Sequence, residues 1–160
     1  IEALHLLEKE DFFCVMIGDD QGRKKYASEL RKMISQYNMT DRFLFIRNVK
    51  DIPAAMMVSD VVLSTSIEPE AFGRIAIEGQ AMGRVVVASN IGGSVETVID
   101  GVTGRLYEST SAEALAKAIE WALHLSTAER EKIGAAGIKN VKEHFKSVAT
   151  LVKFVEDNRK

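Results

Sequence analysis

Two glutamates, Glu70 and Glu78, flank a predicted helix start in the stretch EPEAFGRIAIE. Pro69 disfavours helical geometry in the residue before it, so the helix is expected to begin near Phe72 or Gly73. The first N–H groups of a helix have no acceptor within the helix and lie at the positive end of its dipole, which favours an anion such as a diphosphate. The N–H groups expected to serve here belong to Phe72, Gly73, Arg74 and Ile75.

The two carboxylates are better suited to hydroxyl groups than to phosphate, which they would repel. Glu70, just before the turn, is expected to accept hydrogen bonds from hydroxyls beside the phosphate. Glu78 lies about one and a half turns into the helix, where a carboxylate can accept from both hydroxyls of a ribose. A sugar nucleotide has hexose hydroxyls, diphosphate and ribose in this order. Taken singly, Glu70 could instead be a helix-terminus acid and Glu78 a solvated side chain, and Glu68 is given no role.

Short apolar runs alternate with segments of helical periodicity along the chain. This pattern predicts an α/β fold, a doubly wound Rossmann-like parallel sheet with right-handed crossovers. The predicted strands cover residues 12–17, 43–46, 61–63, 85–88 and, more weakly, 104–107. The predicted helices cover residues 1–9, 24–37, 52–57, 73–82, 111–124, 128–143 and 147–158, and two glycines (Gly134 and Gly137) argue against an unbroken helix over 128–143.

The chain opens on a predicted helix, whereas a doubly wound sheet usually opens on a strand. In the common order 3-2-1-4-5-6 the first strand is central. If this order applies, the five predicted strands are the second to the sixth, and the central strand lies outside these 160 residues. We therefore expect residues 1–160 to be a single domain of a longer protein, ending in helices over about 111–158. The sequence does not indicate an oligomeric state.

Composition narrows the function classes. The net charge is −2, and no basic stripe interleaved with aromatics points to nucleic acid. The only cysteine, Cys14, lies in an apolar run and is predicted to be a core residue, so no internal disulfide forms and a reducing compartment, the cytoplasm, is expected. No run reaches the ~20 apolar residues of a membrane span. Neither a metal site nor a Ser-His-Asp pattern is visible, and His124 and His144 are expected at the surface.

Ligands of an open parallel sheet bind at the carboxyl ends of its strands, so the loops at those ends are candidates for ligand binding. Gly18 opens the loop GDDQGR after the first predicted strand and could permit close approach by a ligand. That loop matches neither G-x-G-x-x-G nor a Walker A motif, and a polar turn explains it equally well. After the fourth strand, Gly92 and Gly93 precede Ser94, which indicates either a turn with a helix N-cap or a backbone nest lining the same cleft.

These motifs together resemble a known family. EAFGRIAIE is similar to the E-x7-E motif of retaining glycosyltransferases of the GT-B fold, in the group 1 class (family four). VMIGDDQGRKKYASELRKMI resembles the second strand, glycine loop and helix of their C-terminal, donor-binding domain. FLFIRNVKDIPAAMMVSDVVLSTSIEPEAFG resembles the approach to the donor site, and AMGRVVVASNIGGSVETVIDGVTGRLYE resembles the segment after it. The resemblance covers roughly Phe12 to Tyr107.

The resemblance implies a role for each motif position. Glu70 would hold the donor hexose, and Phe72, Gly73, Arg74 and Ile75 would present N–H groups to the diphosphate. Glu78 would bind the ribose. Asn48 and Val49 would lie beside the nucleobase, and Gly18 would line the floor of the cleft. The family's Arg and Lys that neutralise the leaving diphosphate, and its N-terminal acceptor domain, are not in these residues, and Arg84 stands where many members carry proline.

The expected function is therefore donor binding for retaining, metal-independent glycosyl transfer from a nucleoside diphosphate sugar, without a cofactor. The acceptor would be a glycan or glycolipid, in lipopolysaccharide or another surface polysaccharide, reached through the missing N-terminal domain. Any peripheral membrane association would also depend on that domain, and this chain alone is expected to be inactive. Two alternatives are a GT-B nucleotide-sugar epimerase, which the Glu70–Glu78 spacing disfavours, and a non-catalytic nucleotide-binding or interaction module.

Overall fold

The computed structural model describes residues 1–47 and 49–145. Its contacts divide the chain into two compact units, Ile1–Ile52 and a second one from Pro53 onward, and each is described here by itself. The predicted helix over 147–158 lies outside the described residues. The description of residues 1–160 as one domain stays a prediction.

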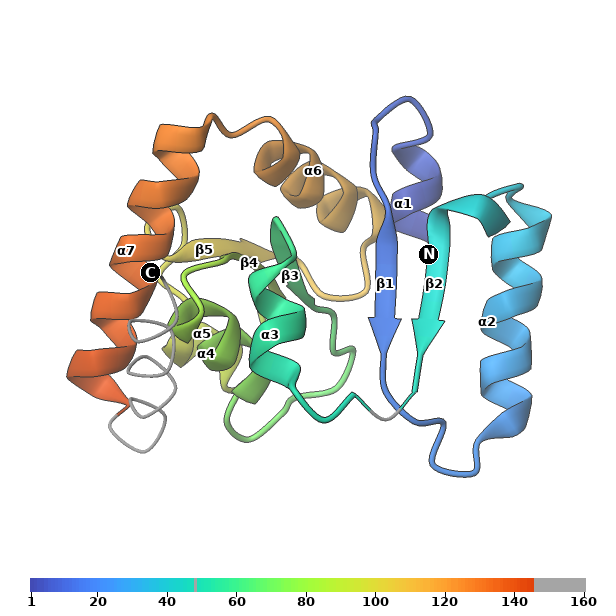
Figure 1. Cartoon of the computed structure of the whole chain (residues 1–160), viewed down its shortest axis with the longest axis horizontal. Helices are drawn as coiled ribbons and strands as arrows, with labels where there is room; N and C mark the ends of the chain where they lie inside the picture. Colours follow the sequence, from blue (N-terminus) through green and yellow to red (C-terminus); the bar gives the residue numbers. More distant parts are fainter. Residues whose placement is uncertain (48, 146–160) are drawn as a thin grey trace. The chain divides into compact units, whose positions relative to one another are not determined.

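The first unit is a parallel β-α-β arrangement. Strands β1 (Cys14–Ile17) and β2 (Phe43–Ile46) pair in parallel, and helix α2 (Lys24–Gln36) connects them (Figure 1). Helix α1 (Glu2–Leu6) precedes β1, and a 3₁₀ turn, η1 (Thr40–Arg42), leads into β2. The first strand starts later than predicted, because its partner β2 begins only after η1, and the register therefore starts at Cys14 opposite Phe43.

The second unit holds a three-stranded parallel sheet in the order β3-β4-β5 (Figure 1). These strands span Val61–Ser64, Val85–Ser89 and Gly104–Tyr107. The helices of this unit are α3 (Ile52–Met57), α4 (Arg74–Ala81), α5 (Ser94–Thr97), α6 (Ala112–Leu123) and α7 (Thr127–His144). Every predicted strand is confirmed to within two residues at either end, whereas α5 was not predicted.

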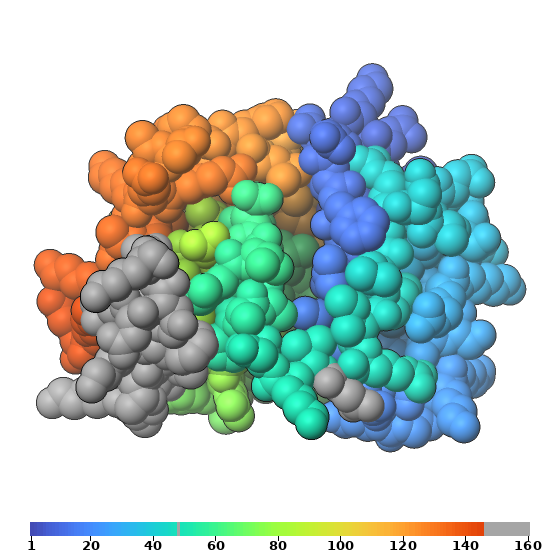
Figure 2. All heavy atoms as spheres, viewed as in Figure 1, coloured from blue at the N-terminus to red at the C-terminus, as the bar shows by residue number. Residues whose placement is uncertain are grey.

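The core of the second unit lies on both faces of β4, whose residues are all buried. Val85 and Val87 pack with Ala118 and Ala122 of α6, whereas Val86 and Ala88 pack with Ala76 of α4. This alternation is what a parallel strand covered on both faces requires. Helix α3 has no buried residue, and its atoms form part of the surface in the space-filling view (Figure 2).

Helix α7 is continuous, although its two glycines argued against this. A Cβ at Gly134 would collide with the carbonyl of Gly83, and one at Gly137 would lie 3.2 Å from the Cβ of Gln80. The glycines therefore allow α7 to pack closely on α4 and the turn after it. The ~1 kcal/mol that a helical glycine costs is offset by this close approach.

The N-terminus of α7 is closed by a capping box that the sequence analysis did not identify. The Ser126 side chain accepts from the Glu129 N–H at 3.3 Å, and the Glu129 carboxylate accepts from the Ser126 N–H at 2.8 Å and from its hydroxyl at 2.6 Å. These bonds to the Ser126 hydroxyl and N–H favour the ionised form and lower the pKa of Glu129.

Replacing Ser126 with alanine is expected to lower the free energy of unfolding by about 1 kcal/mol, because an N-cap acceptor is lost. Since the pKa of Glu129 is lowered in the folded state, its contribution is present above its unfolded pKa and is lost as the pH falls through the folded pKa. The stability difference between wild type and Ser126→Ala should therefore shrink in acid. Urea unfolding at several pH values measures this. Glu131→Gln is the control, and an equal effect of both substitutions would contradict the assignment.

Candidate functional site

The candidate site is built around the first turn of α4. Gly73 is the N-cap, in the left-handed region at φ 61° and ψ 42°, and the helix begins at Arg74. Phe72 therefore precedes the helix, so the prediction that its N–H belongs to the first turn is wrong by one residue. The N–H groups without an intrahelical acceptor are those of Gly73, Arg74, Ile75 and Ala76. Three of the four predicted N–H groups, those of Gly73, Arg74 and Ile75, therefore belong to the first turn, and their binding of an anion stays a prediction.

Two loops at the carboxyl ends of β3 and β4 pack backbone against backbone. A Cβ at Gly93 would lie 2.6 Å from the Phe72 Cα and 2.7 Å from the Gly73 nitrogen. A Cβ at Gly92 would lie 2.5 Å from the carbonyl oxygen of Glu70. Because no side chain fits between these loops, the glycine pair fixes the path of the segment that leads into α4. The Gly93 N–H donates to the Glu70 carbonyl at 2.7 Å and closes the contact.

Glu70 is exposed, and its side chain is held by one neighbour. The Ser66 hydroxyl donates to Glu70 Oε1 at 2.5 Å. Both ends of the residue are therefore anchored, the carbonyl by Gly93 and the carboxylate by Ser66. The role predicted for this carboxylate, binding the hydroxyls of a hexose, stays a prediction.

Glu78 forms an ion pair with Arg74, one turn earlier on α4. Arg74 Nε donates to Glu78 Oε1 at 2.6 Å, and the two side chains are 81% and 16% exposed. The hydrogen bond to Glu78 and its negative charge hold the pKa of Arg74 above its usual range, so the guanidinium is charged. The pair places a cation beside the first turn of α4 and leaves Glu78 largely shielded from water.

The remaining predicted residues belong to the first unit. Gly18 is exposed, has a φ of 150° and has open space where a Cβ would be, and its N–H donates to the Ile46 carbonyl at 3.0 Å. Val49 is half-buried in the loop after β2. Asn48 lies outside the described residues. The loops after β1 and β2 are joined by an ion pair between Arg47 and Asp20 at 2.7 Å.

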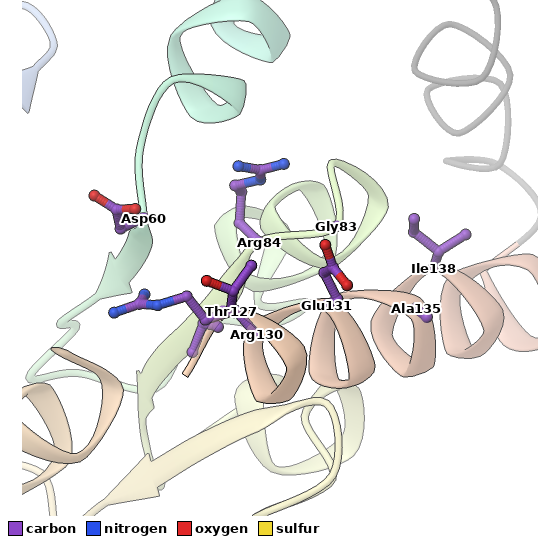
Figure 3. Close-up of a pocket in the computed structure, with 10 residues that line it drawn as sticks. Asp60, Gly83, Arg84, Thr127, Arg130, Glu131, Ala135 and Ile138 are labelled. Atoms are coloured by element: carbon purple, nitrogen blue, oxygen red, sulfur yellow. The ribbon is translucent and has the colours of Figure 1, made fainter. Parts of the chain in front are cut away.

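A cavity of about 650 Å³ lies elsewhere in the second unit (Figure 3). It is lined by Asp60, which precedes β3, and Val85, which starts β4, so it opens at the amino ends of the strands. Arg84 is also in its wall and donates to the Met82 carbonyl at 3.2 Å. Among the described lining residues none belongs to the predicted site, which is at the carboxyl ends.

Other chemistry is not visible within residues 1–47 and 49–145. No group of three or more His, Cys, Asp or Glu side chains there could hold a metal ion. No helix in that part of the chain is long and apolar enough to cross a membrane. Cys14 is partly buried on β1, and this burial raises the pKa of its thiol, as fits a packing residue. His124 and His144 are exposed as predicted.

Three features around the site were not predicted in the form that the structure shows. Ser66 could have been considered, since it lies four residues before Glu70. The Gly92–Gly93 pair was noted as a possible nest, but its role as a packing surface for Phe72 and Gly73 depends on contacts that no local pattern reveals. Gln80, wholly buried on α4, carried no sequence signal that separated it from a surface glutamine.

Parallel strands connected by helices in each unit define a Rossmann-like α/β protein. The family model of "Glycosyl transferases group 1" matches residues 1–140, and the chain belongs to that family. Its α/β fold matches the Rossmann-like C-terminal domain of GT-B glycosyltransferases.

Solved structures and curated relatives agree with this. A glycosyltransferase from Rickettsia africae is 36% identical, with a TM-score of 0.87 over 98% of this chain and 43% of that one. Anabaena HepE in complex with UDP-glucose is 29% identical, with a TM-score of 0.85 over 98% and 42%. A GDP-mannose-dependent alpha-(1-6)-phosphatidylinositol monomannoside mannosyltransferase of Mycolicibacterium smegmatis is 29% identical over 61% of this chain and 28% of that protein. The chain thus spans less than half the length of these relatives.

Proposed function

We propose that this chain binds the nucleoside diphosphate sugar donor of a retaining, metal-independent glycosyltransferase, as the donor-binding domain of a longer protein. The first turn of α4 carries the proposal. It combines N–H groups without intrahelical acceptors, a charged Arg74 and two flanking carboxylates at Glu70 and Glu78. The UDP-glucose bound to the related HepE structure supports a sugar nucleotide as the ligand.

Each group has a part in the proposed reaction. The N–H groups from Gly73 to Ala76 and the Arg74 guanidinium hold the diphosphate and stabilise the charge it gains as it leaves. This charge stabilisation is the work that a divalent metal does in other transferases. Glu70 holds the hexose and Glu78 binds the ribose. Asn48 and Val49 bind the nucleobase, and Gly18 lines the cleft floor.

No dedicated nucleophile is assigned. We propose that the acceptor hydroxyl attacks the anomeric carbon of the donor sugar on the same face from which the diphosphate leaves. A phosphate oxygen of the leaving diphosphate takes the proton of that hydroxyl. The acceptor, a glycan or glycolipid of a surface polysaccharide such as lipopolysaccharide, is bound by a further domain. The contribution of this chain is then positional and electrostatic, and the expected location is the cytoplasm or the cytoplasmic face of a membrane.

Calorimetric titration of the complete protein with UDP-, GDP- and ADP-sugars is the direct test. One nucleotide class should bind with clear preference. If none binds, the proposed function is wrong.

Replacing Glu78 with glutamine should raise the Kd of the preferred nucleoside diphosphate by roughly 10- to 100-fold, because a charged acceptor for ribose hydroxyls is lost. The same titration with the 2′-deoxy form of the nucleotide provides a thermodynamic cycle. If Glu78 binds the ribose, the substitution should raise the Kd of the 2′-deoxy nucleotide far less than it raises the Kd of the ribose nucleotide. Glu96→Gln, an exposed glutamate on α5, is the control. An equal rise in Kd for the ribose and the 2′-deoxy nucleotide would contradict ribose binding by Glu78.

A further inference from the structure

A buried polar network joins α4, α5 and α7 beneath the candidate site. Gln80 of α4 is 0% exposed, Asn140 of α7 is 8% exposed, and Thr97, the last residue of α5, is 2% exposed. Asn140 Nδ2 donates to Gln80 Oε1 at 2.9 Å and to the Thr97 carbonyl at 3.0 Å. Gln80 Nε2 donates to the Thr97 carbonyl at 2.8 Å and to the Ala76 carbonyl at 3.3 Å.

All four amide protons of the two side chains are used, so the network has one arrangement of lowest energy. An apolar pair of similar volume would fill the same space without the cost of burying amides. A buried network in which every amide proton is used instead fixes the relative position of the elements that carry it. Here those elements are the helix that holds the candidate anion site, the short helix beside it, and α7.

The network is connected to the first turn of α4 through α5. The Thr97 carbonyl, at the end of α5, is held by both amides, and Thr97 Oγ1 would lie 3.1 Å from a Cβ at Gly73. At the other end of α5, Gly93 packs on Phe72 and donates to the Glu70 carbonyl. A shift of α5 would therefore move the segment from Glu70 to Gly73, which sets the direction of the first-turn N–H groups.

A second contact links α7 to the same segment. Phe145, directly after α7, meets the ring of Phe72 edge-on, with centroids 6.1 Å apart. The residue that ends α7 thus contacts the segment before α4 directly, through Phe145, whereas Asn140 acts on that segment only through Gln80 and α5. The aromatic contact is independent of the amide network.

From these contacts we infer that Gln80 and Asn140 are positioning residues for the donor diphosphate, acting through Thr97 and Gly93 on the start of α4. This inference rests on the proposed function. It predicts a specific loss: binding of the diphosphate weakens, whereas binding of the nucleoside part changes little.

The test compares Asn140→Leu with Val141→Ala in the complete protein. Leucine replaces the amide with an apolar group of similar size, and Val141, 0% exposed, packs on α4 outside the network. Titration with a nucleoside diphosphate and with the matching monophosphate is the readout, and urea unfolding reports stability. Asn140→Leu should weaken diphosphate binding roughly tenfold, the lower end of the range for residues that orient the ligands of a metal site. Monophosphate binding should stay within about twofold, and Val141→Ala should preserve the diphosphate preference even if it lowers stability.

Two outcomes would overturn the inference while the proposed function stands. In one, Asn140→Leu weakens diphosphate and monophosphate equally. In the other, Val141→Ala reduces the diphosphate preference as much as Asn140→Leu does. If Asn140→Leu does not fold, Gln80→Met is used in its place, since it removes the amide on α4. Its effect is measured by the same ratio of diphosphate to monophosphate affinity. Wild-type protein that binds no nucleoside diphosphate would instead reject the proposed function, and the inference with it.

Discussion

Glycosyl transfer by the complete protein should fall at least about 100-fold when Glu70 is replaced with glutamine. In the proposed site, this carboxylate accepts hydrogen bonds from hexose hydroxyls, and charged hydrogen bonds of this kind contribute about 1.5–3 kcal/mol each. Its negative charge also stabilises the positive charge that develops on the sugar ring during transfer. Steady-state kinetics should place the loss mainly in kcat, since the nucleotide is held by other groups.

Glu68→Gln is the matched control for this experiment. Glu68 lies two residues earlier in the same exposed loop and carries the same side chain. Its replacement should leave kcat within about twofold, because an exposed surface change away from a site has little effect. If both variants lose activity equally, the loop rather than the Glu70 carboxylate is responsible, and the role given to Glu70 is wrong.

The second large effect is expected at Gly93. Alanine there should lower the free energy of unfolding by about 3 kcal/mol, the upper part of the range for overpacking. The φ of Gly93 is −61°, which alanine adopts without strain, so the cost comes from the collision with Phe72 and Gly73. Displacing these residues by about 1 Å would move the first-turn N–H groups and cost roughly 100-fold in transfer. Urea unfolding and a donor-dependent transfer assay measure the two effects.

Gly101→Ala separates collision from backbone conformation. Gly101 has a φ of 73° but open space around the added Cβ, the reverse of the situation at Gly93. Gly101→Ala should lower the free energy of unfolding by about 1 kcal/mol, because alanine disfavours the left-handed backbone conformation, and should leave glycosyl transfer unchanged. A Gly93→Ala protein that is as stable and as active as wild type would contradict the backbone-packing account.

Much of the fold follows from local pattern. β2 has the predicted bounds because it is a short apolar run, and β5 has them because it is a short segment between turn residues. The helix α5 was missed because four residues are too few to show helical periodicity. The helix predicted over 128–143 is unbroken despite its two glycines because they serve close packing on α4, a tertiary effect that overrides local propensity.

The site was predictable where it depends on neighbours in sequence. Pro69 and the glycine after Phe72 placed the helix start within two residues of its position. The support for that start was not predictable, since Gly93 and Asn140 approach it from elements that lie far along the chain. Asn140 is 60 residues from Gln80, and no spacing rule connects an amide on one helix with an amide on another at that separation.

The packing of Gly92 and Gly93 against the segment before α4 has a consequence for how such a protein diversifies. The proposed phosphate seat consists largely of main-chain N–H groups, with the Arg74 guanidinium beside them, so its shape depends mainly on how the backbone is packed. Substitutions of the exposed Ile75 side chain, which has no assigned role, should leave the seat in place. Substitutions are expected to be most damaging at the glycines that allow the two loops to touch and at the buried residues that hold α5. A library that varies exposed side chains around the seat and leaves those residues alone is therefore the economical route to new donor preferences.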